Sequence, residues 1–74
     1  MTTIHPTAVI DPSSTIEDGA MIGASCFIGP NVIIGAGTKL FNHVTVQSDT
    51  TIGNDNKIYP FCVIGGDPQD KKYN

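Results

Sequence analysis

The chain has 74 residues, four lysines or arginines, two cysteines and a formal net charge of −3 at pH 7. This length builds one domain at most, and an acidic balance without a run of lysine or arginine argues against a nucleic-acid surface. No long apolar stretch and no charged start followed by an apolar run occurs, which argues against a membrane-spanning helix and a secretion signal, so we expect a cytoplasmic protein.

A period of six residues runs along the chain. The aliphatic positions are Ile4, Ile10, Ile16, Ile22, Ile28, Ile34, Leu40, Val46, Ile52, Ile58 and Ile64. Residues two positions earlier, from Ala8 to Cys62, are nearly all small, and residues two apart in a strand point to the same side. Both registers are therefore predicted to face an interior, with the residue between them facing out. Each hexapeptide makes one strand and one corner.

Glycine follows the aliphatic position in five repeats. These residues are Gly23, Gly29, Gly35, Gly53 and Gly65. We expect the chain to bend sharply there, because a residue without Cβ is free to adopt unusual backbone conformations.

Three sides close a triangular coil, and successive coils stack at roughly 4.8 Å. The sequence therefore predicts an all-β fold, a parallel β-helix of about four coils. We expect residues 1–74 to form a single hexapeptide-repeat segment. Because repeat stacks need capped ends and no cap is visible after Gly65, we expect an amino-terminal fragment of a longer domain.

The outward residues also fall into columns. Val9, Phe27, Thr45 and Val63 share one column, which is apolar in three of its four members. An exposed apolar stripe usually marks a contact surface, and a three-sided prism suits a closed cyclic oligomer. We predict a homotrimer; the alternative is scattered surface hydrophobes without consequence.

Histidine and cysteine offer little chemistry. Cys26 and Cys62 fall in one inward column two coils apart, roughly 10 Å, which exceeds disulfide reach, so we predict reduced thiols. His5 and His43 fall at corners, where we expect solvated or capping side chains rather than general bases. Two distant histidines and two inward cysteines do not make a metal site. No catalytic residue and no metal ligand is predicted within the chain.

The run from Gly65 to Tyr73 leaves the six-residue rhythm. It concentrates amide, carboxylate, ammonium and phenol groups, which can bind a polar ligand. The alternative is a solvated loop that protrudes from a corner.

Several stretches together carry a family resemblance. They are Ile4-His5-Pro6-Thr7-Ala8-Val9-Ile10, Ile28-Gly29-Pro30, His43-Val44-Thr45-Val46 and Ile64-Gly65, followed by Pro68-Gln69-Asp70-x-Lys72-Tyr73. Over its whole length the chain resembles the amino-terminal part of bacterial UDP-N-acetylglucosamine acyltransferases. Hexapeptides alone are shared with sugar acyltransferases, acetyltransferases and γ-class carbonic anhydrases, whereas the Gln-Asp-x-Lys-Tyr segment is much more specific.

The resemblance implies a left-handed coil, which periodicity cannot show because parallel crossovers are normally right-handed. It implies a cytoplasmic homotrimer without a cofactor that moves a 3-hydroxyacyl chain from acyl carrier protein to the 3-hydroxyl of UDP-N-acetylglucosamine. This is the first step of lipid A biosynthesis. The family's general base is a histidine of a later coil, beyond Asn74, and the active site lies between adjacent subunits.

Motif matching also assigns substrate-binding residues. Gln69 and Asp70 would supply hydrogen-bonding groups in the substrate cleft, and Lys72 a cation near the substrate; Tyr73 receives no role. Lys71 departs from the family pattern, in which an aliphatic residue is frequent at this position.

Two other functions remain open. One is a different hexapeptide transferase, such as a glucosamine N-acyltransferase or a serine or sugar acetyltransferase. The other is a non-catalytic β-helix module whose apolar stripe mediates assembly. Because the base is missing, the 74-residue chain alone is expected to be inactive.

Overall fold

The computed structural model describes residues 2–65, and all structural statements below concern these residues. Each hexapeptide contributes one two-residue strand. The strands are β1 (Thr3–Ile4), β2 (Val9–Ile10), β3 (Thr15–Ile16), β4 (Met21–Ile22), β5 (Phe27–Ile28), β6 (Ile33–Ile34), β7 (Lys39–Leu40), β8 (Thr45–Val46), β9 (Thr51–Ile52), β10 (Lys57–Ile58) and β11 (Val63–Ile64).

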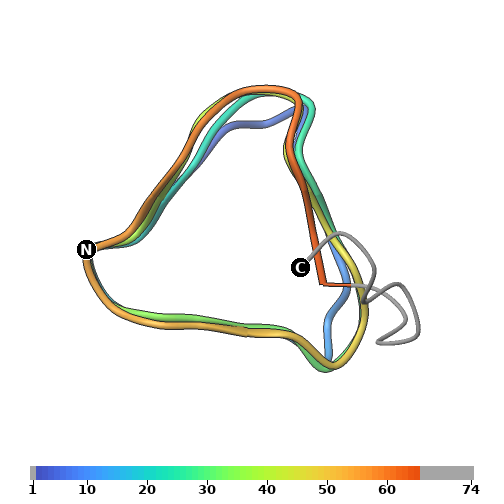
Figure 1. Ribbon diagram of the computed structural model, residues 1–74, viewed down its shortest axis with the longest axis vertical. Coiled ribbons are helices and arrows are strands. Elements are labelled where there is room, and N and C mark those ends of the chain that lie inside the picture. The colour runs from blue at the N-terminus through green and yellow to red at the C-terminus, as the bar shows by residue number, and fades with distance from the viewer. Residues whose placement is uncertain (1, 66–74) are drawn as a thin grey trace, which may run out of the picture.

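Every third strand pairs in parallel, which makes three sheets with the orders β1-β4-β7-β10, β2-β5-β8-β11 and β3-β6-β9. The sheets form the sides of a triangular prism (Figure 1). Ile4 pairs with Ile22, and Ile22 with Leu40, so one coil takes eighteen residues. Eleven strands make three coils and two sides of a fourth. The predicted fold, a parallel β-helix of about four coils, is confirmed.

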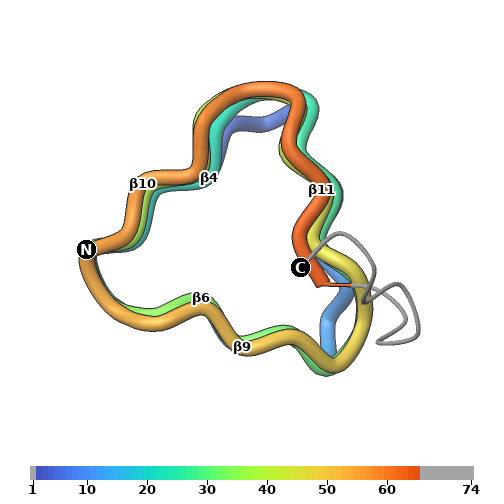
Figure 2. Tube along the Cα trace, viewed as in Figure 1, coloured from blue at the N-terminus to red at the C-terminus, as the bar shows by residue number. Residues whose placement is uncertain are grey.

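The coil is left-handed, as the family resemblance implied. In Figure 2 the path runs clockwise from β9 through β10 to β11, and these later strands lie in front of the earlier ones. A chain that turns clockwise while it approaches the viewer describes a left-handed helix. The usual right-handed preference holds for long crossovers packed on a sheet, and here each connection is a four-residue corner.

The core lies along the axis of the prism. Both inward registers are almost fully buried in the middle coils, where Ile22, Ile28, Ile34, Leu40 and Val46 are at most 1% exposed. Burial of each such side chain contributes about 1.5–3 kcal/mol. Coils join through the backbone: the N–H of Gly23 donates to the carbonyl of Leu40 at 2.8 Å, and that of Gly29 to Val46 at 2.9 Å.

One polar residue, Thr38, is fully buried in this core. Its hydroxyl donates to the Gly53 carbonyl at 2.6 Å and accepts the Asn56 N–H at 3.2 Å. The inward column therefore tolerates a hydroxyl because both of its hydrogen-bonding functions are used on the next coil.

The expected role of glycine as the bending residue was wrong at four of five positions. From Gly19 to Phe61, the left-handed backbone occurs at the third residue after each aliphatic one, as in Asn31 (φ 57°) and Asp49 (φ 60°). Only Gly65 among the five has a positive φ. Lack of space explains Gly23, Gly29 and Gly35: a Cβ at Gly23, for example, would lie 2.7 Å from the Phe41 carbonyl oxygen in the next coil.

Two corners of the first coil accept their hydrogen bonds from the second coil with side chains. In later coils a corner N–H donates to a backbone carbonyl one coil earlier, as from Asp49 to Pro30 at 3.0 Å. Above the first coil, the N–H of Ser25 donates to the Thr7 hydroxyl and that of Asn31 to the Ser13 hydroxyl, both at 2.9 Å. Side-chain oxygens thus replace carbonyls at the amino-terminal end of the stack.

Replacing Thr38 with valine is expected to lower the free energy of unfolding by about 1–3 kcal/mol, because the Gly53 carbonyl and the Asn56 N–H lose a buried partner. Urea denaturation of the variant and wild type measures the difference. Thr51→Val makes the same chemical change on an exposed outward position and should be nearly neutral. Equal effects of the two substitutions would contradict the assignment.

Candidate functional site

The three substrate-binding residues predicted from the sequence, Gln69, Asp70 and Lys72, lie outside the described residues. The described chain ends at Gly65, which directly follows β11. The residues around Gly65 are the described residues closest in the chain to the predicted substrate-binding segment. The Gln47 N–H donates to the Ile64 carbonyl at 2.9 Å, and a Cβ at Gly65 would collide with the side chain of Thr50.

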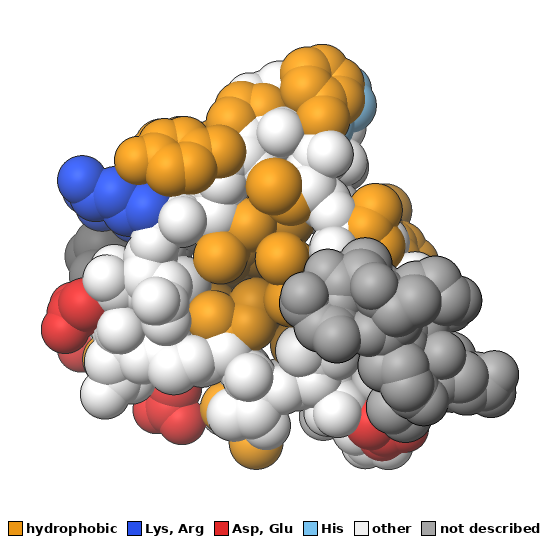
Figure 3. Space-filling view, viewed as in Figure 1, with side chains coloured by type: hydrophobic (Ala, Val, Ile, Leu, Met, Phe, Trp, Pro, Cys, Tyr) orange, Lys and Arg blue, Asp and Glu red, His pale blue; other side chains and the backbone are white. Residues whose placement is uncertain are grey.

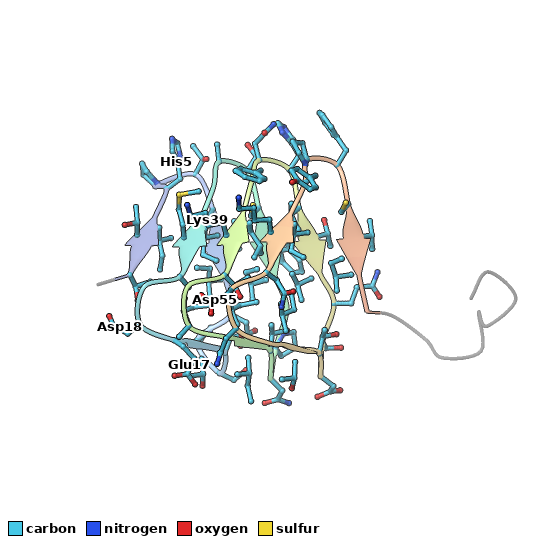
Figure 4. The ribbon with its side chains drawn as sticks, turned by 60° about the vertical axis from the view of Figure 1, so that its left-hand side comes forward. His5, Glu17, Asp18, Lys39 and Asp55 are labelled. Carbon is cyan, nitrogen blue, oxygen red and sulfur yellow. The ribbon has the colours of Figure 1, made fainter. Side chains whose placement is uncertain are left out.

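His5 forms hydrogen bonds within the corner to which it belongs. Its Nδ1 accepts the Thr7 N–H at 3.2 Å and lies 2.9 Å from the Thr7 hydroxyl. Figure 4 shows His5 at a different corner from Glu17 and Asp18, so these carboxylates do not orient it as a general base. The expectation of a capping histidine is confirmed for His5.

His43 also lies at a corner and has a left-handed backbone, with φ 57°. Its ring stacks on Phe61 with centroids 5.0 Å apart, and its Nδ1 lies 2.9 Å from the Asn42 side-chain amide nitrogen. An amide nitrogen is a donor only, so Nδ1 acts as the acceptor. Neither an amide donor nor an aromatic ring is the kind of partner that orients a catalytic base.

The sequence reasoning missed an aromatic corner that joins the β7/β10 side to the β8/β11 side. Phe41 stacks on Tyr59 with ring centroids 5.4 Å apart, beside the stack of His43 on Phe61. Tyr59 is 62% exposed and Phe61 76%. The signal was present in the sequence, because the members of each pair are eighteen residues apart and lie on successive coils.

The apolar outward column predicted from the sequence is present. Val9, Phe27, Thr45 and Val63 pair in register on β2, β5, β8 and β11. The three apolar members are between 47% and 63% exposed. Figure 3 looks onto one end of the prism and shows hydrophobic side chains at its top corner and on the adjoining right-hand edge. The aromatic corner directly precedes β8 and β11 in the chain, so the column and the corner are neighbours. Exposed apolar side chains of this kind are typical of a contact site.

Both cysteines are free thiols, as predicted. The buried Cys26 thiol donates to the Phe41 carbonyl at 2.9 Å, so it has a structural hydrogen bond. Among residues 2–65, no group of three or more His, Cys, Asp or Glu side chains could hold a metal ion. Within the same range no helix is long and apolar enough to cross a membrane.

Comparison with known proteins identifies close relatives. The family model described as bacterial transferase hexapeptide (six repeats) matches residues 1–36 and 31–66. An acyl-(acyl-carrier-protein)–UDP-N-acetylglucosamine O-acyltransferase of Psychrobacter sp. is 53% identical over 74 residues, which is 100% of this chain and 29% of that protein.

Two solved structures share the fold. The UDP-N-acetylglucosamine acyltransferase of Francisella novicida superposes with a TM-score of 0.87 at 44% identity, over 97% of this chain and 26% of that one. LpxA from Acinetobacter baumannii gives 0.86 at 52% identity, over 96% of this chain and 28% of that one. The chain thus spans less than a third of the length of the proteins it matches.

The pKa of Asp11 is lowered by hydrogen bonds within its own corner. Its carboxylate accepts the Ser13 N–H at 2.9 Å and the Ser13 hydroxyl at 2.7 Å, and these hydrogen bonds lower the pKa of Asp11 below its ordinary value of 3.8. Hydrogen bonds to the charged form favour it. This carboxylate therefore stabilises the fold above the ordinary pKa, and its contribution is lost as the pH falls through the lowered value.

Ser13→Ala is expected to move the pKa of Asp11 upward toward its ordinary value, because the hydroxyl donor is lost while the backbone donor remains. A pH titration of the Asp11 carboxyl carbon by NMR measures the shift. Ser25→Ala, at the matching place of another corner, should leave the pKa of Asp11 unchanged. An unaltered pKa in Ser13→Ala would contradict the hydrogen-bond explanation.

Proposed function

The chain belongs to the bacterial transferase hexapeptide family, and on that premise we propose that it is the amino-terminal part of a UDP-N-acetylglucosamine O-acyltransferase that takes its acyl group from acyl carrier protein. The observation that carries the proposal is the 53% identity over all 74 residues. That alignment extends beyond the repeats into residues 66–74. A hexapeptide protein of another function need not share this segment.

The proposed reaction is acyl transfer. The 3-hydroxyl oxygen of UDP-N-acetylglucosamine attacks the thioester carbonyl of a 3-hydroxyacyl chain, the C–O ester bond forms, and the C–S bond breaks. A general base takes the hydroxyl proton, and the thiol of the carrier protein leaves with a proton. The reaction involves no change of oxidation state and needs no cofactor. In this proposal the product enters lipid A biosynthesis and the protein acts in the cytoplasm.

This chain contributes part of the substrate cleft in the proposal. Gln69 and Asp70 form hydrogen bonds with the substrate, and Lys72 places a cation near it. The general base comes from a later coil, since both histidines of this chain hold corner positions through contacts with Thr7, Asn42 and Phe61. Residues 1–74 form one segment of a longer β-helix and have no transferase activity alone.

A homotrimer completes the proposal. The exposed column of Val9, Phe27 and Val63 supplies an apolar surface on one side of each prism, and a closed ring of three copies would remove it from water. A cleft between copies would also enclose a substrate that a convex prism cannot.

Asp70→Asn in the full-length protein is expected to lower kcat/KM for UDP-N-acetylglucosamine by roughly 10- to 100-fold, the loss of a hydrogen bond of about 1.5–3 kcal/mol to a charged group. Radiolabelled acyl transfer measures it. Asp49→Asn removes a carboxylate from an earlier corner and should retain activity. Absence of acyl transfer by the wild-type protein would exclude the proposed enzymatic function. Wild-type activity in the Asp70→Asn variant would exclude the role proposed for Asp70.

Phe27→Glu in the full-length protein is expected to convert the trimer into monomers, because burial of an unpaired carboxylate opposes assembly. Sedimentation velocity at micromolar concentration distinguishes the two states. Ile33→Glu makes the same kind of change on another side of the prism, where Ile33 is 41% exposed, and should leave the trimer intact. Wild-type monomers would rule out the trimer.

A further inference from the structure

The corner between β3 and β4 contains the sequence Asp18-Gly19, which occurs once in the chain. Both residues are exposed, and Figure 4 shows the Asp18 side chain pointing away from the prism. An aspartate followed by glycine can close spontaneously to a succinimide ring, because glycine has no side chain to hinder its own backbone nitrogen. Hydrolysis of this ring gives isoaspartate, in which the main chain continues through the former side chain.

The conformation of this corner brings the two reacting groups together. The backbone N–H of Gly19 donates a hydrogen bond to the Asp18 carboxylate, so the nitrogen already faces the group that it must attack. Gly19 has a φ of +81°, and a Cβ added there would meet only the N and Cα of Gly37, at 3.6 and 3.8 Å. Because the groups are held close to each other before they react, the entropic cost of ring closure is reduced.

The other aspartates among residues 2–65 lack this arrangement. Asp11 is followed by a proline, whose nitrogen has no proton to lose. Asp49 is followed by a threonine, whose branched side chain crowds the backbone. Asp55 is followed by Asn56, whose N–H donates to the Thr38 hydroxyl at 3.2 Å. Ring closure is therefore expected at only one of the four positions.

From these observations we infer that Asp18-Gly19 is a site of spontaneous isoaspartate formation in the folded protein. In the first step the Gly19 nitrogen bonds to the Cγ of the neutral Asp18 acid, the bond from Cγ to its hydroxyl breaks, and the hydroxyl leaves with the amide proton as water. In the second step water opens the imide at the former backbone carbonyl, which becomes a carboxyl group. The reaction needs no oxidant and no enzyme, and the inference does not depend on the proposed acyltransferase function.

The modification would alter a contact between two coils. The Asp18 carbonyl accepts the Gly37 N–H at 3.3 Å, and in isoaspartate this carbonyl becomes a carboxyl group outside the main chain. One additional backbone atom would also enter the corner directly before Ala20, which is buried. We expect the isolated modified protein to melt at a lower temperature than the unmodified protein. Equal melting temperatures would contradict this structural effect.

The test is prolonged incubation of the folded full-length protein at physiological temperature, followed by digestion with endoproteinase Asp-N, which cleaves before aspartate but not before isoaspartate. We expect cleavage before residue 18 to be lost at least about 10-fold faster than cleavage before residues 49 and 55, which corresponds to a barrier lower by about 1.4 kcal/mol. Protein L-isoaspartate methyltransferase with radiolabelled S-adenosylmethionine should label the same peptide. Because the neutral acid reacts, the rate should be higher at about pH 6 than at about pH 8.

Asp18→Glu is the matched control, because it keeps the charge but would have to close a less favourable six-membered ring. This variant should lose the methyl label at residue 18. Asp18→Asn tests the geometry from the other side, since a side-chain amide loses ammonia more readily than a carboxylic acid loses water. It should form aspartate and isoaspartate at residue 18 faster than the wild type forms isoaspartate.

Four results would overturn the inference. They are the absence of isoaspartate at residue 18 in the folded protein, similar rates at residues 18, 49 and 55, wild-type labelling of Asp18→Glu, and an Asp18→Asn variant that does not deamidate. A parallel incubation in urea shows whether the corner geometry contributes. Isoaspartate that forms in the unfolded chain but not in the folded protein would count against the inference.

Discussion

The structure depends on the backbone hydrogen bonds that join each coil to the next. The N–H of Gly35 donates to the Ile52 carbonyl at 2.8 Å, and the same bond recurs from coil to coil. This ladder fixes the spacing between coils and places equivalent positions directly above one another. The nearest neighbours of each residue are therefore the residues eighteen positions before and after it. Aliphatic side chains therefore stack on aliphatic side chains. Glycine is needed where the backbone of the next coil comes close, as Gly35 shows against Gly53.

The same constraint explains which parts of the fold could be predicted. A strict period of six specifies strand, corner and core, since a single shift would turn Ile22 or Leu40 to the outside. The corner conformation was not predictable in the same way. Polar residues such as Asn31 and Asp49 tolerate the left-handed region, but Phe61 adopts it too, with φ 63°. Its conformation is imposed by the stack, and residue type alone does not reveal it.

The candidate site could be predicted less directly from the repeat than the fold could. Residues that obey the repeat specify the architecture, whereas the residues proposed to bind substrate lie where the repeat ends. The role proposed for Asp70 comes from the family motif Gln-Asp-x-Lys-Tyr. The aromatic corner was not predicted, because Phe41 and Tyr59 obey the eighteen-residue spacing and do not depart from the repeat. That spacing places the two rings of each pair on successive coils, so the sequence alone is sufficient to predict both stacks.

The filled interior also limits where chemistry can occur. Both inward registers of the middle coils are closed by side chains such as Val32, Thr38 and Val44, all 0% exposed, so the prism has no room for a ligand along its axis there. A small-molecule site normally buries most of its ligand, and the flat side of a prism cannot do so. A transferase built on this fold therefore needs walls that the coil does not supply. In the proposed function, residues 66–74 and a neighbouring copy of the chain supply these walls. For this reason the break in the repeat and the exposed apolar column belong to the same functional argument.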